Sequence, residues 1–478
     1  MRPVVNFLNG ELIRKIYNEA QEVLCKIGIE VHNDNVKNLL LEHGAKYNED
    51  KSRILLTWRM IRKSLVTTPN SFKVYDTFGE EVHDFFEDNV CFNPGSAAIT
   101  VLDYETKKIR KPIVEDYQDY TKIINQLDNI QLQSTAIIPS DIPENISDSY
   151  RLLLSLQYCK KPVVTGCFSI ESFEVMKDMQ LAIRGTEENL KEKPLTIFSC
   201  CPTSPLKWSK VTSQNLIDCA KYSIPVEFIA MPLSGFMAPV TLFGTLIQHT
   251  AETLSGIVIS QCANPGTPIL YGGSPAIFDV RHETTPMGAI ETMMIDCAYN
   301  EIGKFFHLPT QAYISFSDAK QVDAQAGLES GIGATLAALA GINSISGPGM
   351  LDFESCQSLE KLVIDNEICG MTFRMLKGIS PNGDIPSIPL FEELLSEKHL
   401  LISDHTLKNI KEEHFVPSAV INRENSKRWE QGGSSTMEAR AHNEIEKMLE
   451  NYEKPQLSKE QINDLNKIAH NLFNYLPH

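Results

Sequence analysis

The sequence contains no run of about 20 apolar residues, which is the length that a helix needs to cross a bilayer. Its start, MRPVVNFLNGELIRK, also lacks the apolar stretch and the small-residue cleavage site of a signal peptide. We therefore expect a cytoplasmic protein with no membrane partner.

Paired cysteines and basic clusters are missing as well. The 11 cysteines form no CxxC pair, and Cys91, Cys167, Cys200 and Cys201 lie within apolar runs. This pattern is typical of reduced core thiols rather than of a disulfide framework. The formal net charge of −17 is spread along the chain. Such a charge argues against a nucleic-acid partner and is compatible with cationic ligands.

What the sequence does contain is enough apolar residues for a large core, since 42% of its 478 residues are hydrophobic and 22% are charged. Eight short apolar runs resemble buried strands, and each is followed by an amphipathic stretch long enough for a helix. The runs cover 90–92, 132–138, 162–168, 195–201, 225–231, 268–271, 310–316 and 342–345. The helices are expected near 114–128, 145–159, 171–185, 208–222, 241–263, 287–306, 323–340 and 355–377.

Alternating β and α units predict a parallel sheet, because parallel neighbours need a crossover connection. Eight units over about 290 residues favour a closed (β/α)8 TIM barrel of the α/β class. The alternative is an open doubly wound sheet. That fold would normally carry a GxGxxG turn after its first strand, and none occurs there.

Helical segments flank the predicted barrel on both sides. Residues 1–88 are expected to form an N-terminal helical cap segment or an oligomer contact, and 89–380 the catalytic barrel. Residues 381–478 are expected to form a C-terminal helical extension that ends in a polar tail, with the linker-like GDIPSIPL near its start. Helices are expected at 10–29, 33–43, 57–64, 388–397 and 434–452.

The loops after the strands are where a barrel of this kind carries its function. In QAYISFSDAK, the apolar run ends on Ser317, Asp318 and Lys320, which places polar side chains at the barrel mouth. The alternative is that Asp318 caps the next helix and Lys320 is solvated. Three other loop entries combine glycines with small polar side chains, and they supply Asn93, Ser96, Ser274 and Ser346.

Aromatic residues lie at or near several predicted strand ends. Their faces could form a cage for a quaternary ammonium ion, which attracts ring faces and takes no part in hydrogen bonds. The alternative is that most of them are ordinary core residues. The set is Phe92, Phe168, Phe236, Tyr271, Tyr313, Phe316 and Phe353.

Two long stretches resemble the trimethylamine:corrinoid methyltransferase family. They are SDAKQVDAQAGLESGIGATLAALAGINSISGPGMLDFESCQSLEKLVIDNEI and QHTAETLSGIVISQCANPGTPILYGGSPAIFDVR. The first-strand NPGSAA is also similar. The resemblance implies a (β/α)8 barrel that moves a methyl group from an amine to the cobalt of a separate small corrinoid protein, with no cofactor tightly bound to this chain. It also suggests a homo-oligomer.

One departure from that family concerns pyrrolysine, which the namesake enzyme carries and this sequence does not. The chain therefore resembles non-pyrrolysine members such as glycine betaine:corrinoid methyltransferase. The resemblance then implies a quaternary amine as substrate: glycine betaine, proline betaine, carnitine or γ-butyrobetaine. A quaternary nitrogen already bears the charge that makes a tertiary amine a leaving group, so no activating electrophile is needed.

On this interpretation, catalysis is positioning and electrostatics, with no acid or base assigned. A carboxylate on the substrate would need cationic donors, for which Arg281, His282 and Lys320 are the candidates. Asn93, Ser96, Ser274 and Ser346 could supply neutral hydrogen bonds. Glu354 or Asp318 could complement the ammonium group.

No Cys/His cluster with the spacing of a metal site is present, so we expect no metal. His249 and Glu252 could share one helix face, but a single such pair is better explained as structural. Two other functions stay open: a barrel lyase or hydrolase acting on a small cationic amine, and a non-catalytic protein that binds quaternary amines.

Overall fold

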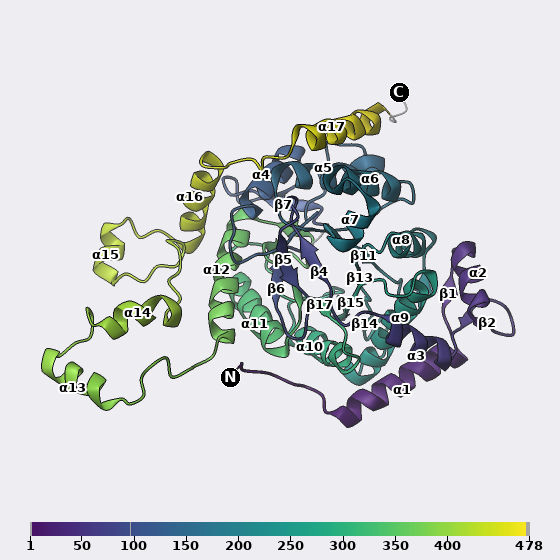
Figure 1. Cartoon of the computed structure of the whole chain (residues 1–478), viewed down its shortest axis with the longest axis horizontal. Coiled ribbons are helices and arrows are strands. Elements are labelled where there is room, and N and C mark those ends of the chain that lie inside the picture. Colours follow the sequence, from purple (N-terminus) through teal and green to yellow (C-terminus); the bar gives the residue numbers. More distant parts are fainter. Residues whose placement is uncertain (1, 96, 475–478) are drawn as a thin grey trace.

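The computed structural model describes residues 2–95 and 97–474, and its centre is an eight-stranded parallel sheet rolled into a barrel (Figure 1). Its strand order is β6-β18-β17-β15-β13-β11-β10-β9, so each strand lies beside one that the chain reaches through a helical crossover. The strands are β6 (Cys91–Asn93), β9 (Gln133–Ser134), β10 (Val163–Thr165), β11 (Thr196–Cys200), β13 (Val226–Phe228), β15 (Ile269–Gly273), β17 (Thr310–Tyr313) and β18 (Ser344–Ser346).

Hydrogen bonds between β9 and β6 bring the two ends of the sheet together. The Leu132 amide donates to the Phe92 carbonyl over 3.2 Å, and the Ala98 amide donates to the Ala136 carbonyl over 2.7 Å. The Ser134 hydroxyl also donates to the Pro94 carbonyl over 3.0 Å. The predicted barrel is therefore confirmed, and the open sheet is wrong.

The helices around the barrel follow the strands in the predicted order. Polar side chains start several of them; for example, Asp323 accepts from the Gln325 and Ala326 amides, and Ser358 accepts from the Lys361 amide. The helices are α4 (Val114–Ile124), α5 (Ser147–Tyr158), α6 (Ser172–Arg184), α7 (Glu187–Glu192), α8 (Lys210–Lys221), α9 (Leu242–Ala263), α10 (Ile290–Phe305), α11 (Ala324–Ala340) and α12 (Leu359–Leu376), with a 3-10 turn η1 (Glu144–Ile146) before α5.

Short strands within the loops cover the carboxyl ends of the barrel strands. A four-stranded sheet joins the loops after β6 and β18, in the order β19-β20-β7-β8. A second pair, β14 with β16, joins the loops after β13 and β15. Their bounds are β7 (Thr100–Leu102), β8 (Ile109–Arg110), β14 (Leu233–Ser234), β16 (Ala276–Ile277), β19 (Met350–Leu351) and β20 (Cys356–Gln357).

The first 88 residues cover the outside of the barrel and the end at which its strands begin. Helix α1 (Gly10–Lys26) packs on α9, as do α2 (Asp34–Glu42) and α3 (Trp58–Thr67). The hairpin of β4 (Lys73–Tyr75) and β5 (Glu81–Asp84) places Phe72, Val74 and Phe85 against the first residues of the barrel strands. This hairpin therefore closes the amino end of the barrel. The remaining strands are β1 (Glu30–Val31), β12 (Lys207–Trp208), β2 (Lys46–Tyr47) and β3 (Ile54–Leu55).

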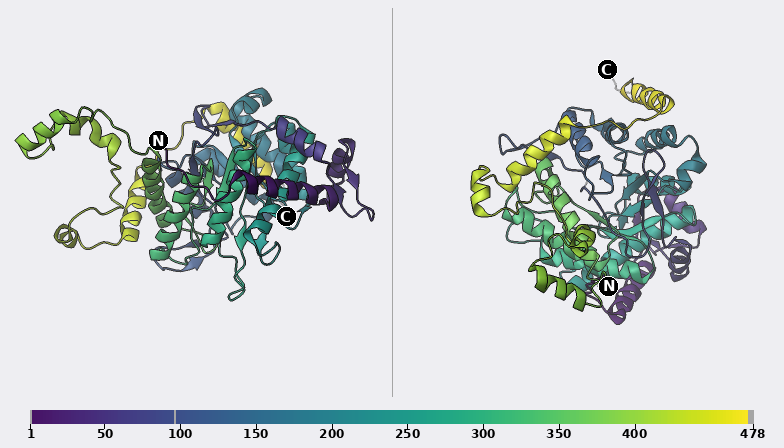
Figure 2. Two further views of the ribbon diagram at one scale, coloured as in Figure 1. Left: turned by 90° about the horizontal axis from the view of Figure 1, so that it is seen from below. Right: turned by 60° about the vertical axis from the view of Figure 1, so that its left-hand side comes forward.

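After α12 the chain leaves the barrel and then returns. Helices α13 (Ile388–Glu397), α14 (Asp404–Glu413) and α15 (Ser426–Gln431) belong to an arm, residues 379–433, that extends sideways from the body (Figures 1 and 2). Helix α16 (Met437–Glu450) then packs on α12. The expected polar tail contains a helix, α17 (Lys459–Asn474), which packs on α6. None of the helices within the described residues is long and apolar enough to cross a membrane.

Candidate active site at the barrel mouth

A layer of polar side chains points inward near the carboxyl ends of the barrel strands. Alternate residues of a strand face the same way, so this layer collects one or two positions from each strand. Its members come from β6, β11, β13, β17 and β18: Asn93, Ser199, Glu227, Gln311, Tyr313, Ser344 and Ser346.

Glu227 is the carboxylic acid of this layer and is fully buried. Its Oε1 accepts hydrogen bonds from the Ser199 hydroxyl at 2.7 Å and from the Tyr313 hydroxyl at 3.2 Å. Its Oε2 has no hydrogen-bond partner among the described residues. Burial raises the pKa of Glu227 to about 7, although the two hydrogen bonds act in the opposite direction. The mouth thus contains a carboxyl group that changes charge near neutral pH.

Neutral polar groups beside Glu227 are held in fixed orientations. Asn93 Nδ2 donates to Ser344 Oγ over 3.0 Å, and Asn93 Oδ1 accepts from Ser346 Oγ over 2.8 Å. Gln311 Nε2 donates to the Phe228 carbonyl over 2.8 Å, while Gln311 Oε1 has no partner among the described side chains and backbone. Asn93 and Ser346 therefore hold each other in place at the ends of β6 and β18, and their contact with a substrate stays a prediction.

A second carboxylate reaches the mouth from the loop after β18. Asp352, Phe353 and Glu354 have φ values of 49°, 54° and 68°, a left-handed run that non-glycine residues rarely adopt. This backbone carries Glu354 toward β6, where a Cβ on Gly95 would lie 2.9 Å from Glu354 Oε1. Burial raises the pKa of the Cys201 thiol to about 12, and the nearby charges of Glu227 and Glu354 add to this effect. Both carboxylates therefore act on the same part of the mouth.

An apolar cluster covers this polar layer. Tyr313 and Phe316 belong to it, and both are buried. The other buried members are Ala98, Ile229, Ala276, Met287 and Met350. Carboxylates beneath aromatic and apolar walls form an environment that favours a poorly hydrated cation.

The other five aromatic candidates are not in that cluster. Phe92 packs edge-on against Phe373 of α12, with ring centroids 5.3 Å apart. The Tyr271 hydroxyl donates to Thr250 of α9 over 3.3 Å. The exposed Phe236 stacks on Phe278 at 4.8 Å. Of the last two, Phe353 lies beneath the Lys320 amine at 3.8 Å, and Phe168 beside the Arg151 guanidinium at 4.7 Å.

The residues that follow β17 join loops together at the rim. Asp318 accepts from the Met287 amide at 3.1 Å and the Gly288 amide at 3.0 Å, which anchors the loop before α10. Burial raises the pKa of Asp318 to about 6. Lys320 donates to the Asp318 carbonyl over 2.7 Å and pairs with Asp352 at 3.4 Å.

The remaining candidates are dispersed. Ser274 is buried at the end of β15. Arg281 is exposed and pairs with Asp279 at 2.6 Å, in the turn that also contains His282. Ser96 lies outside the described residues.

A cavity of about 230 Å³ opens into the mouth between α5, α8 and the ends of β9, β10 and β11. Ser199, the hydrogen-bond donor to Glu227, lines it, and so does Arg151 of α5. Sequence reasoning missed both Glu227 and Arg151. A signal was present in both cases, because Glu227 lies inside the apolar run PVEFIA and Arg151 begins the apolar run RLLLSL.

No group of three or more His, Cys, Asp or Glu side chains in the described part of the chain is arranged to hold a metal ion. His249 contacts the Gly272 carbonyl at 3.1 Å, whereas Glu252 accepts from Ser204 and the Leu206 amide. The two side chains therefore serve separate structural contacts.

Comparison with known proteins gives a family for this barrel. The family model described as "Trimethylamine methyltransferase (MTTB)" matches residues 1–471. The chain belongs to this family. Trimethylamine methyltransferase MttB of Methanosarcina barkeri is 30% identical, with 97% of this chain and 94% of that protein covered. The glycine betaine methyltransferase of Desulfitobacterium hafniense is 28% identical, with 96% and 95% covered.

A solved structure is similar as well. The crystal structure of the Methanosarcina barkeri monomethylamine methyltransferase MtmB is 13% identical, with a TM-score of 0.47. The alignment covers 98% of this chain and 94% of that one.

Proposed function

We propose that this chain transfers a methyl group from a quaternary amine, glycine betaine or a related betaine, to the Co(I) of a separate corrinoid protein. The observation that carries the proposal is the buried Glu227 carboxyl group, which lies beside the apolar cluster of Tyr313 and Phe316. One of its oxygens, Oε2, has no hydrogen-bond partner among the described residues. An ionised carboxylate in a low-dielectric site favours a cation strongly. A quaternary ammonium ion suits this oxygen because the ion needs an opposite charge nearby and cannot form a hydrogen bond.

The transfer is a displacement at carbon. The Co(I) electron pair forms the new cobalt–carbon bond while the carbon–nitrogen pair goes to nitrogen, which leaves as a neutral tertiary amine. The fixed Asn93 and Ser346 side chains and the apolar cluster would hold the cation in line with the mouth. The sequence consists of standard amino acids, and this substrate class requires no further electrophile.

The relatives support a methylated amine as substrate, and one of them is a glycine betaine methyltransferase. The corrinoid would come with the partner protein and meet the substrate at the mouth, where the β19-β20-β7-β8 sheet forms part of the rim. No cofactor resident in this chain is part of the proposal. The reaction would take place in the cytoplasm.

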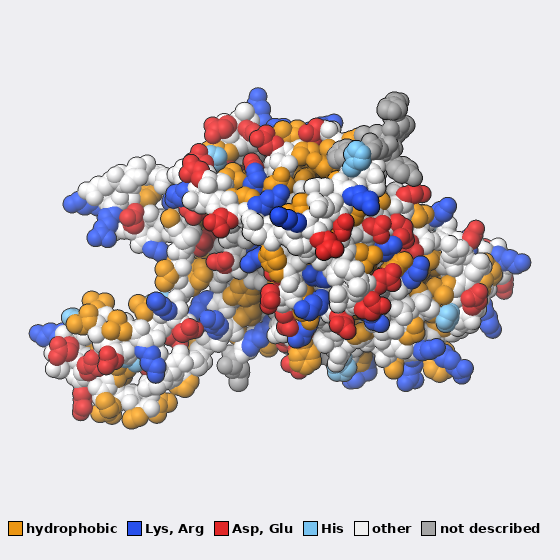
Figure 3. All heavy atoms as spheres, turned by 45° about the horizontal axis from the view of Figure 1, so that its top comes forward, with side chains coloured by type: hydrophobic (Ala, Val, Ile, Leu, Met, Phe, Trp, Pro, Cys, Tyr) orange, Lys and Arg blue, Asp and Glu red, His pale blue; other side chains and the backbone are white. Residues whose placement is uncertain are grey.

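The arm supports a homo-oligomer. None of the residues in α13 or α14 is buried. The exposed apolar side chains on these helices and in the turn between them are Ile388, Phe391, Leu395, Leu401, Ile402 and Leu407 (Figure 3). Glu413, at the end of α14, pairs with Arg374 of α12 at 2.8 Å, but the apolar side chains of the arm stay exposed. Exposed apolar helix faces of this kind favour a further partner. The arm leaves from the end of α12 opposite the mouth, because barrel helices run antiparallel to the strands. Helices α13 and α14 follow closely after that end of α12, and a second copy of this chain is the partner that we propose for them.

The test of the proposed activity is to mix the protein with reduced cob(I)alamin and a panel of amines and to follow the spectrum of methylcobalamin. At least one quaternary amine should give methylcobalamin, and trimethylamine should give none. Methylation from trimethylamine alone would contradict the choice of substrate class. Amine cleavage without cobalamin would indicate a lyase or hydrolase, and binding without methylation a non-catalytic binding protein.

A further inference from the structure

Arg151 is a cation buried at the side of the barrel mouth, and the activity proposed above gives it no task. Its side chain, on α5, is 1% exposed. Nη1 donates to the Thr135 carbonyl over 2.6 Å and Nε donates to the Ser147 carbonyl over 3.2 Å. These bonds, with the Phe168 ring at 4.7 Å, fix the plane of the guanidinium.

The charge of Arg151 is not matched by an ion pair. In the described part of the chain, no carboxylate forms a salt bridge with it, and its two hydrogen bonds, from Nε and Nη1, both go to backbone carbonyls. Asp148 is close enough to raise the pKa of Arg151, but burial dominates and lowers it. The Asp148 oxygens instead accept from the Phe168 and Ser149 amides and the Ser172 hydroxyl. A buried charge without a partner is costly, which indicates that an anion is missing here.

The place of that anion is the cavity of about 230 Å³ beside the mouth, which Arg151 lines. Ser199 lines the same cavity and donates to Glu227. One small space therefore has a guanidinium at one wall and adjoins a carboxylate at another. This volume is below the ~300–1,000 Å³ of pockets for drug-sized ligands, so it suits a small metabolite.

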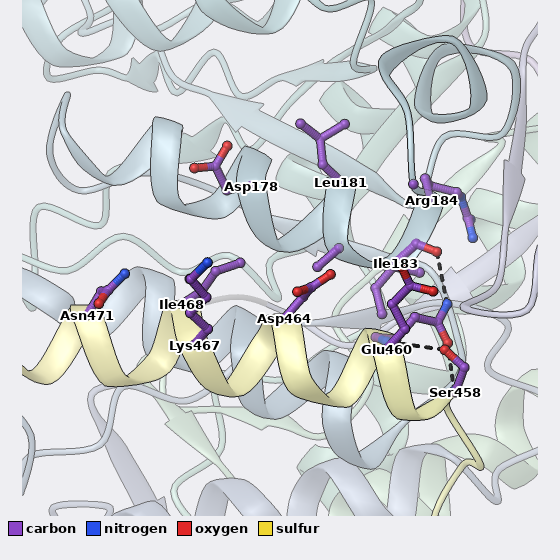
Figure 4. A pocket seen from close by; sticks show the side chains of 13 residues that line it. Asp178, Leu181, Ile183, Arg184, Ser458, Glu460, Asp464, Lys467, Ile468 and Asn471 are labelled. Carbon is purple, nitrogen blue, oxygen red and sulfur yellow. Dashed lines mark hydrogen bonds between the residues drawn. The ribbon is translucent and has the colours of Figure 1, made fainter.

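Two other arginines differ from Arg151 in their surroundings, and neither lines the cavity beside the mouth. Arg281 is exposed and pairs with Asp279. Arg184 is also largely buried, but it donates to the Lys193, Tyr75 and Asp76 carbonyls. It borders a different cavity, of about 670 Å³, between α6 and α17 on the outside of the barrel (Figure 4). Arg184 is therefore a suitable control for the loss of a buried guanidinium.

We propose that Arg151 binds the carboxylate of a zwitterionic substrate, whose quaternary nitrogen lies toward Glu227. This inference rests on the proposed function and deepens it: the substrate would be a small betaine rather than a quaternary amine with an uncharged tail. Arg151, and not Arg281, His282 or Lys320, then determines specificity. A guanidinium is suited to this task because it presents a planar set of N–H groups to a carboxylate.

The test uses three ligands whose dissociation constants are measured by calorimetry. Glycine betaine carries both charges, choline carries only the cation, and 3,3-dimethylbutanoate is the carbon isostere of glycine betaine with only the anion. Arg151→Gln should weaken betaine and 3,3-dimethylbutanoate at least tenfold and change choline by less than about threefold. Arg184→Gln should leave all three constants within about twofold of the unmodified protein.

Two results would overturn the inference: unchanged betaine binding in a folded Arg151→Gln variant, or an equal loss for choline and betaine. If that variant does not fold, a competition experiment on the unmodified protein tests the inference. There, 3,3-dimethylbutanoate should compete with betaine, and a failure to compete would overturn the assignment. Failure of the proposed function would differ from both. In that case no quaternary amine would methylate cob(I)alamin, whereas 3,3-dimethylbutanoate would still bind in an Arg151-dependent manner.

Discussion

The Tyr313 hydroxyl donates a hydrogen bond to Glu227 Oε1 over 3.2 Å, and thereby joins two strands that are not neighbours. Tyr313 ends β17 and Glu227 lies in β13, with β15 between them in the sheet. The bond passes across β15 on the inside of the barrel, so it ties the orientation of the buried carboxyl group to a second strand of the wall. Substitution of either residue should therefore change the affinity for the substrate's ammonium group.

Replacing Glu227 by Gln should remove the charge and keep the shape. The Ser199 and Tyr313 hydroxyls can still donate to the amide oxygen, so the fold should persist. Glycine betaine binding at pH 8 should weaken by roughly 2–5 kcal/mol, as for other buried charges that lose their partner. Calorimetry on the folded variant measures this loss. Ser260→Ala, at a buried hydroxyl of α9 without a partner among the described residues, is the control. Full affinity in Glu227→Gln would remove Glu227 from the ammonium site.

Amine affinity should depend on pH because the pKa of Glu227 is raised to about 7. Below pH 7 the carboxyl group is mostly protonated and neutral, so the cation meets no opposite charge there. Affinity should rise as pH increases through 7 and level off near pH 8, and binding at pH 6.5 should release a proton. Titrations in buffers with different heats of ionisation measure this release. A flat profile from pH 6 to 8 would contradict the role of Glu227, and Glu227→Gln should give such a profile.

The Phe316 ring should matter for cation binding. Phe316→Leu keeps an apolar side chain in the cluster and removes the aromatic face, so amine binding should weaken by about 1–2 kcal/mol. Phe236→Leu is the matched control, because Phe236 is exposed and stacks on Phe278 outside the cluster. Equal losses in the two variants would argue against a specific contact between Phe316 and the cation.

The arm should be required for self-association. The double substitution Leu395→Glu with Ile402→Glu would place charges on the exposed apolar surface of the arm. Light scattering should then show a shift from oligomer to monomer. Val66→Glu, at an exposed apolar position on α3, should leave the mass unchanged. An oligomer that survives the double substitution would show that the arm is not the contact.

Much of the fold followed from the sequence because hydrophobic periodicity is a local signal. The runs 162–168 and 195–201 contain β10 and β11, and α13 has the predicted bounds 388–397. Helix α17 was missed because its buried residues, Leu465 and Leu472, lie seven apart in a mostly polar stretch. Its packing on α6 is a tertiary effect.

The site was less predictable than the fold. Asn93, Ser346, Tyr313 and Phe316 were recognised at strand ends, and the structure brings them together at the mouth. Tyr271 looked equivalent, but the alternation of β15 turns its ring toward α9. Whether a residue faces the barrel interior or the surrounding helices depends on the register of its strand. Its position at a strand end in the sequence does not reveal that register.

The hairpin β4–β5 closes the lower end of the barrel with Phe72, Val74 and Phe85. With that end filled by apolar side chains, we propose that both reactants enter through the mouth. The amine would then have to be inside before the corrinoid protein docks, and the demethylated product would stay until that protein departs. Turnover would then be strictly ordered, with product exit linked to the lifetime of the two-protein complex.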